Sequence, residues 1–245
     1  MRAAWAALLL VAAPAPAEED LVSGLSQDIV QITSDYTGTD LIVFGAVEQP
    51  VENGVGDVVV VVRGPDAAMT VRRKDRLAGI WINDARARFV LPSFYFVAST
   101  RPLRQIAAEE TLARYELGLS RLHADPLASD GDPAPFVAAL VRAEARSGLY
   151  RQNPAGVEML GATLFRVRVP VPAAVPRGSY NVEVYLFRDG NVVSAQSTPL
   201  YVDQTGFERR LYDFAHSRPL YYGVATVLLA VFLGWASTLF FRRRE

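Results

Sequence analysis

Short apolar stretches rich in β-branched residues alternate with turn-forming residues along most of the chain, and this pattern predicts β-strands. We expect residues 28–32 and 40–47 to form two antiparallel strands joined by a turn at Gly38. Residues 57–65 are so continuously apolar that they predict a central strand covered on both faces. In residues 162–172, apolar side chains alternate with arginines, which predicts a strand with one buried face.

A hairpin is predicted in the middle of the chain. Residues 68–74 and 78–83 are expected to pair, with Lys74 near the tip. Residues 89–99 are expected to follow as one longer strand, and Pro92 predicts that this strand lies at an edge or carries a bulge.

A second hairpin is indicated near the end of the strand-rich region. Residues 179–187 and 191–202 flank Asp189 and Gly190, and Asp-Gly between apolar stretches is a strong hairpin signal. A proline-bearing loop precedes Tyr180, as in the entry to the last strands of immunoglobulin-like domains. By this analogy the fold class is mainly β, an immunoglobulin-like β-sandwich.

Helical spacing replaces the strand pattern within about residues 102–149. Apolar residues recur at helical intervals in residues 103–118, which predicts a first helix. A second helix is expected to start after Asp132, a capping residue, and to end at Gly148. The sequence therefore predicts a two-helix insertion in the β domain.

The last stretch predicts a transmembrane helix. Residues 219–241 carry no charge, and a helix of this length reaches about 34 Å, enough to cross a hydrocarbon core of about 30 Å. The alternative is a buried core helix, which rarely runs this long without a polar face. Residues 206–218 predict a short amphipathic helix resting on the lipid bilayer, with a plain stalk as the alternative.

The amino terminus predicts the topology. Residues 1–17 combine Arg2, a short apolar stretch and small residues before an acidic segment, as in a cleaved secretory signal peptide; a non-cleaved anchor is the alternative. Residues 18–205 would then form a periplasmic domain, and residues 242–245 a cytoplasmic tail. Because arginines flank the apolar helix on both sides, the orientation depends mainly on the signal peptide.

Composition argues against several classes of function. The net charge of −1 gives no broad field that would recruit nucleic acid. The chain has no cysteine, and His123 and His216 lie far apart without metal-ligand spacing, so we expect no metal site, no cofactor and no enzymatic activity. A hydrolase built from His123 and a distant serine is the enzymatic alternative.

Two sets of residues are candidates for binding. The first is a basic patch in the predicted hairpin, suited to binding a small anion or an acidic surface of another protein. The alternative is that these charges only keep the tip of the hairpin solvated and discourage aggregation through its edge. It consists of Arg72, Arg73, Lys74, Arg76, Trp81 and Asn83. The second is a ladder of small residues in the predicted transmembrane helix, on which another transmembrane helix could pack closely. The alternative is that this face of the helix only contacts lipid. It consists of Thr226, Ala230, Gly234 and Thr238.

Several motifs together resemble a family of transmembrane proteins from alphaproteobacteria. They are SQDIVQITSDYTGTDLIVFGA, VVVVRGP, VRRKDRLAGIWIN, PSFYFVASTRPL, GSYNVEVYLFRDG and GFERRLYDFAHSRPLYYG. The resemblance assigns no activity, so no catalytic residues carry over. It implies a transport-accessory role, because members occur beside permeases that look like sulfite or sulfonate exporters.

We therefore expect a non-enzymatic protein that crosses the inner membrane once. Its periplasmic domain would act as a binding or scaffolding accessory to an integral membrane protein, such as a sulfite-exporter-like permease. The alternative is a membrane-anchored periplasmic domain that binds a small anion or senses the state of the envelope.

Overall fold

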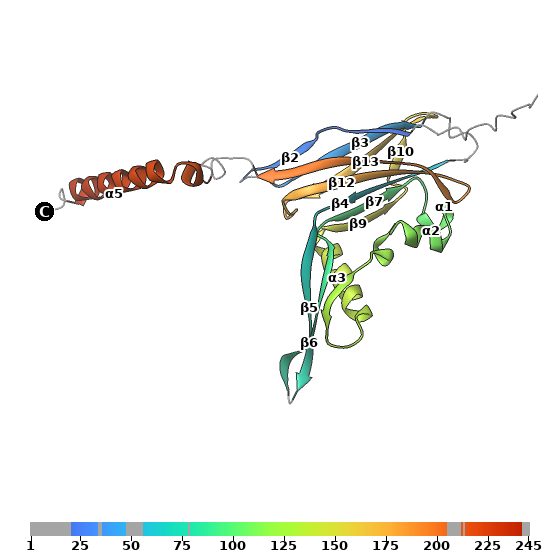
Figure 1. Cartoon of the computed structure of the whole chain (residues 1–245), viewed down its shortest axis with the longest axis horizontal. Coiled ribbons are helices and arrows are strands. Elements are labelled where there is room, and N and C mark those ends of the chain that lie inside the picture. Colours follow the sequence, from blue (N-terminus) through green and yellow to red (C-terminus); the bar gives the residue numbers. More distant parts are fainter. Residues whose placement is uncertain are drawn as a thin grey trace, which may run out of the picture.

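The computed structural model consists of a β domain, a long two-stranded projection and a separate C-terminal helix (Figure 1). It describes residues 21–33, 36–47, 56–77, 79–204, 212 and 214–241. The predictions of a mainly β chain and a single C-terminal apolar helix are confirmed. Three predicted segments fall wholly or mostly outside the described residues: 1–17, 206–218 and 242–245.

Two sheets build the β domain. In spatial order, the larger comprises β2 (Ile29–Ile32), β13 (Asn191–Gln204), β12 (Gly178–Arg188), β4 (Asp57–Arg63), β7 (Tyr95–Ser99) and β9 (Tyr150–Pro154). The smaller comprises β1 (Leu21–Leu25), β3 (Gly38–Val47), β11 (Leu164–Pro172) and β10 (Val157–Met159).

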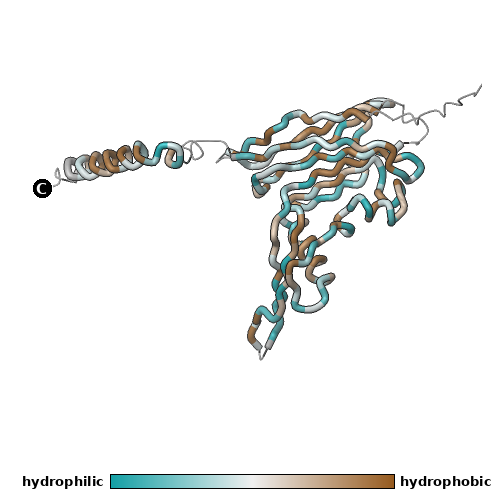
Figure 2. Tube along the Cα trace, in the orientation of Figure 1, coloured by the Kyte–Doolittle hydropathy of each residue, from teal (hydrophilic) through white to brown (hydrophobic). Residues whose placement is uncertain are grey.

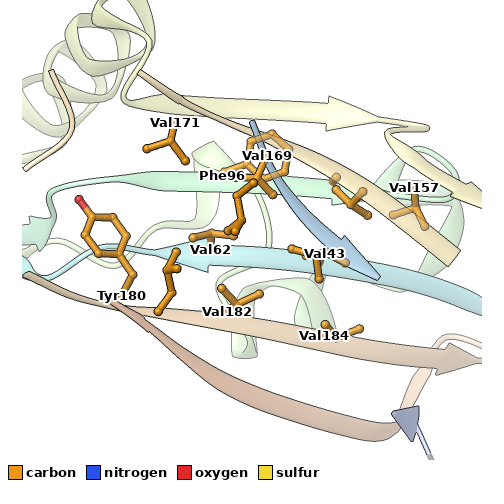
Figure 3. Packing of buried hydrophobic residues seen from close by; sticks show 14 of the residues in the cluster. Val43, Val62, Phe96, Val157, Val169, Val171, Tyr180, Val182 and Val184 are labelled. Atoms are coloured by element: carbon orange, nitrogen blue, oxygen red, sulfur yellow. The ribbon is translucent and has the colours of Figure 1, made fainter. Parts of the chain in front are cut away.

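The core between these two sheets is made of alternating apolar side chains. Val43 and Val169 of the smaller sheet face Val62, Phe96 and Val182 of the larger one (Figure 3). The other face of the larger sheet is buried as well, beneath the segment between β7 and β9. Strand β4 is therefore covered on both faces, as its continuously apolar sequence predicts.

The predicted pairing of residues 28–32 with residues 40–47 is wrong. β2 runs parallel to β13 in the larger sheet, whereas β3 belongs to the smaller one. Strand β1, which the sequence pattern did not indicate, pairs antiparallel with β3 on one side, and β11 pairs with it on the other. Because both edges of β3 are occupied, β2 pairs elsewhere.

A two-stranded arm projects from the larger sheet (Figure 1). We use this name for β5 (Asp66–Leu77) and β6 (Ile80–Pro92), which pair antiparallel along their whole length. The predicted hairpin is thus present and longer than expected. One register runs without interruption from the pairing of β4 with β7 into that of β5 with β6.

The arm leaves the sheet at a bend that both chains share. The Gly64 amide donates to the Phe94 carbonyl at 2.8 Å, and the Ser93 amide donates to the Pro65 carbonyl at 2.9 Å. The predicted single strand at residues 89–99 is therefore two strands, β6 and β7, separated by this bend. Prolines on both chains suit the site, since proline cannot donate a ladder hydrogen bond.

The insertion between β7 and β9 lies where the sequence predicts it but is not a simple pair of helices. It comprises α1 (Leu103–Ile106), α2 (Glu109–Arg114), the 3₁₀ turn η2 (Leu119–Arg121), β8 (Asp125–Ser129) and α3 (Ala134–Ser147). The segment between the two predicted helices contains β8, which pairs with β6 as a third strand beside the arm. α3 matches the prediction: the Asp132 carboxylate accepts from the Ala134 amide at 3.0 Å, and Gly148 ends the helix with φ 82°.

The break between α1 and α2 has a geometric cause. At about 100° per residue, Leu103 and Leu112 would point to opposite sides of one continuous helix. Both side chains are buried in the same core. An extended conformation at Ala107 and Ala108 separates the two helices and allows this burial.

The C-terminal helix α5 (Pro219–Phe241) stands apart from the β domain (Figure 1). Its stretch Pro219–Ser237 is long and apolar enough to cross a membrane, and none of that stretch is buried. Apolar residues cover it in a continuous band (Figure 2). A bilayer is the environment that would solvate such a surface.

Candidate functional site

The burial of side chains in the arm changes along its length. Near the bend, Ala85, Ala87, Phe89 and Leu91 of β6 are buried in one cluster with Phe136 of α3. Beyond Ala85, every described side chain of β5 and β6 is exposed. The outer half of the arm therefore has no core of its own.

Cross-strand pairing sorts the predicted basic patch onto two faces. Arg76 lies opposite Trp81, and Lys74 lies opposite Asn83, so these four side chains share one face. Arg72 belongs to the same face because side chains alternate along β5. The structure thus brings five of the six predicted residues together.

Arg73 is the exception among the predicted residues. It lies opposite Ala85, on the other face of the arm, and its guanidinium pairs with the Asp84 carboxylate at 2.9 Å. Asp84 is the extra residue of a bulge in the ladder. Arg73 therefore lies on the other face from the rest of the predicted patch, and its role in binding stays a prediction.

Two further arginines extend the basic face toward the bend. Arg86 lies opposite Arg72, and Arg88 lies opposite Thr70. The sequence carries a signal for them, since ARAR at residues 85–88 alternates small and charged residues as an amphipathic strand does. Among the described residues, five exposed cations form no ion pair on this face: Arg72, Lys74, Arg76, Arg86 and Arg88.

The tip of the arm is apolar as well as basic. Ile80, Trp81 and Ile82 are 69%, 66% and 38% exposed. Ile80 and Ile82 lie on the face opposite Trp81. Three successive apolar side chains are thus exposed to solvent at the tip, on both faces of the arm.

A cavity of about 520 Å³ lies where the arm meets α3. Arg72 and Arg73 line it together with Asp130 and Asp132. Because both signs of charge are present, the cavity offers no net field that selects an anion.

Arg63 fixes the base of the arm to the insertion. Its guanidinium donates to Glu116 at 2.9 Å, to Glu183 at 3.2 Å and to the Tyr115 carbonyl at 2.8 Å, and it lies 5.5 Å from the centre of the Tyr95 ring. Burial would lower the pKa of Arg63, but Tyr95 and the two carboxylates outweigh it and raise the pKa. This clamp is structural: each carboxylate is engaged by the cation.

Tyr95 joins the same cluster from the larger sheet. Its hydroxyl donates to the Glu116 carbonyl at 2.8 Å and accepts from the Gly118 amide at 2.9 Å. Burial raises the pKa of Tyr95 to about 12. The phenol is therefore a neutral structural group at physiological pH.

The histidines lie apart, as their sequence positions suggest. His123 pairs with Asp125 at 3.1 Å on an exposed loop, and His216 stacks on Tyr212 with ring centres 3.9 Å apart. Within the described part of the chain, no group of three His, Cys, Asp or Glu residues is arranged to hold a metal ion.

The ladder of small residues on α5 is described except for the Thr238 side chain. The Thr226 hydroxyl donates back to the Tyr222 carbonyl at 2.8 Å, so its polar group is satisfied within the helix. A methyl group added at Gly234 would meet no atom within 4 Å. The face is open, and its role in helix packing stays a prediction.

Within the described residues, a mainly β domain is joined to one unburied apolar helix, which defines a membrane protein with a candidate C-terminal span. The chain belongs to the family described as "Putative transmembrane protein (Alph_Pro_TM)", whose model matches residues 20–243. This match confirms the resemblance found in the sequence motifs. No curated protein matches the chain.

Proposed function

We propose that this protein is a non-enzymatic accessory of an integral membrane protein and that the arm is its recognition element. The observation that carries the proposal is the basic face of the arm, where five exposed cations lack an ion-pair partner within the described residues. Cations displayed along a projecting ribbon suit an acidic surface, because complementary charge guides association and fixes orientation.

The proposed location is the inner membrane, with the β domain in the periplasm and the C-terminus in the cytoplasm. The signal-like residues 1–17 support this orientation. The absence of cysteine fits a domain whose large buried core needs no disulfide.

The proposed partner is a sulfite-exporter-like permease. The family resemblance supplies this suggestion, and the small-residue ladder at Thr226, Ala230, Gly234 and Thr238 offers a face on which a partner helix could pack closely. Contacts would then form at two levels, with the arm outside the bilayer and α5 within it.

An immunoglobulin-like fold is also proposed for the β domain. The order β1-β3-β11-β10 corresponds to strands A-B-E-D of that fold, and β13-β12-β4 corresponds to G-F-C. The Tyr180 hydroxyl donates to the Pro176 carbonyl four residues earlier, as in a tyrosine corner. Such domains commonly serve recognition, which agrees with a binding role by analogy only.

The test is photo-crosslinking in native membranes. A photoreactive residue in place of Asn83 should capture an integral membrane protein, and the triple variant R72E/K74E/R76E should reduce capture by about tenfold or more. The matched control is R142E/R146E on the exposed side of α3, which should leave capture unchanged. The proposal is wrong if Asn83 captures no membrane protein, or if both charge-reversed variants behave alike.

The contribution of α5 is tested separately. A230L/G234L fills the open face with bulky side chains and should reduce co-purification of the partner in detergent. The control V227A/V231A changes side chains on a neighbouring face and should have no effect. Equal co-purification of all three proteins would remove α5 from the interface.

The alternative function is capture of a small anion by the same cations. Under it, millimolar sulfite or a sulfonate would raise the melting temperature of the full chain, and R72E/K74E/R76E would abolish the rise. An unchanged melting temperature across these anions would rule this alternative out.

A further inference from the structure

We propose that the tip of the arm inserts into the headgroup region of an anionic bilayer, the same bilayer that α5 crosses. This inference rests on the proposed function, since a partner embedded in that membrane is met at its surface. At that surface, Ile80, Trp81 and Ile82 would contact acyl chains, and the basic face of the arm would contact lipid phosphates.

The arm and the membrane anchor leave the β domain near the same end. Gly178, at the start of β12, pairs with Val202 near the end of β13 and lies against Pro65 at the bend of the arm. From that end the chain continues beyond Gln204 toward α5. In Figure 1 the arm leaves the sheet near this end and runs across the direction of the strands, and α5 lies beyond the same end.

The arm is long compared with the chain that leads to the anchor. Eight residue steps separate Gln204 from the helical residue Tyr212, so the chain between them spans at most about 29 Å. The eleven steps of β5 from Asp66 to Leu77 extend the arm by about 36 Å. The proposal requires the β domain to tilt on this short connection so that the arm turns toward the membrane surface.

The order of side chains along the arm suits a bilayer. Ile80 lies nearest the tip, and Trp81 and Arg76 form the next cross-strand pair. Ile82 lies one step behind that pair, and Lys74 and Arg72 lie farther back. Apolar groups and tryptophan enter the boundary of a bilayer while cations contact its phosphates, so a tip that carries Ile80 and Trp81 ahead of Lys74 and Arg72 fits a lipid surface.

Fluorescence of Trp81 in nanodiscs tests the insertion. The full-length variant W5F/W235F leaves Trp81 as the only tryptophan. In nanodiscs containing brominated anionic lipid, we expect its emission to shift to shorter wavelength and to be quenched. Each cation removed from the basic face should shift the equilibrium between the bound and the free arm by about fivefold, so R72Q/K74Q/R76Q should lose most of the quenching.

Two controls isolate the tip. A tryptophan at Phe44, in the background W5F/W81F/W235F, reports the exposed outer face of the smaller sheet and should not be quenched. Nanodiscs of zwitterionic lipid alone should show weaker quenching of Trp81. The inference is overturned if brominated lipid leaves Trp81 emission unchanged, or if R72Q/K74Q/R76Q matches the parent.

Failure of this inference and failure of the proposed function give different results. If Trp81 is not quenched but a photoreactive residue at Asn83 captures a membrane protein, the arm contacts protein alone and the accessory role stands. If Trp81 is quenched but nothing is captured, the arm is a lipid contact and the accessory role falls.

Discussion

The Arg63 guanidinium lies 2.9 Å from the Glu116 carboxylate and joins two parts of the molecule that are distant in sequence. Arg63 ends β4 at the base of the arm, whereas Glu116 follows α2 with a left-handed backbone (φ 52°). That conformation is unfavourable for a residue with a side chain. Its presence at this point indicates that the clamp matters for holding the insertion on the sheet.

Replacing Arg63 should therefore destabilise the β domain. R63M keeps the aliphatic stem but leaves Glu116 and Glu183 without their cation, which should lower the free energy of unfolding by about 2 kcal/mol given that both carboxylates are partly exposed. Urea unfolding followed by far-UV circular dichroism measures the change. R88M, at an exposed arginine without an ion pair among the described residues, is the matched control and should differ from the parent by less than about 0.5 kcal/mol.

Gly178 offers a test of how the arm is seated. Its φ of 147° disfavours any side chain, and an added methyl group would lie 2.8 Å from Cγ of Pro65. We expect G178A to lower the free energy of unfolding by about 1–3 kcal/mol. G161A, where a methyl group meets nothing within 4 Å, should change it little. Equal stability of the two variants would show that the contact with Pro65 is not tight.

Local signals explain which parts of the fold could be predicted from the sequence. The Asp189-Gly190 turn closes the β12–β13 hairpin, with positive φ at both residues, as the dipeptide predicts. Strand β4 and helix α3 can also be predicted from the sequence. A strand buried on both faces is continuously apolar, and a capped helix carries its capping residues at its ends.

The errors have a common origin in tertiary pairing. Nothing within residues 28–32 indicates that β13 is their partner, because parallel pairing depends on a strand about 170 residues away. The shared bend of the arm likewise depends on two chain segments meeting, Gly64-Pro65 and Pro92-Ser93. Sequence periodicity is local and cannot specify such contacts.

The candidate site shows the same limit on a smaller scale. The cluster of cations around Lys74 is recognisable from composition, and Arg73 faces away from it because side chains alternate along β5. The bulge at Asp84 places Arg86 and Arg88, rather than Ala85 and Ala87, on the face that carries Trp81 and Asn83. A one-residue irregularity in the ladder thus decides the membership of the site.

The tip of the arm should contribute to binding and hardly at all to stability. W81S/I82S removes exposed side chains from a segment without buried residues, so we expect the free energy of unfolding to change by less than about 0.5 kcal/mol. The buried counterpart F89S lies in the cluster beneath the arm and should lower it by more than about 3 kcal/mol. A large loss of stability in W81S/I82S would mean that the tip packs on the protein itself.

Stability should fall in alkaline solution through the buried tyrosines. Burial holds the folded-state pKa of Tyr95 at about 12, above its ordinary value of 10.0, because ionisation would place a charge in the core. The stability that depends on its neutral phenol is fully present below pH 10 and is lost as the pH rises toward 12. Burial also raises the pKa of Tyr150, Tyr180 and Tyr185, so several groups add to the decline.

Unfolding free energies measured across this pH range separate the contribution of Tyr95. Y95F removes one titrating group, so its stability should fall less steeply above pH 10, although it starts about 1–3 kcal/mol lower because the Glu116 carbonyl and the Gly118 amide lose their partner. Y201F, at an exposed tyrosine of β13, should follow the parent. If Y95F and the parent decline with the same slope, the Tyr95 phenol is not what the alkaline transition titrates.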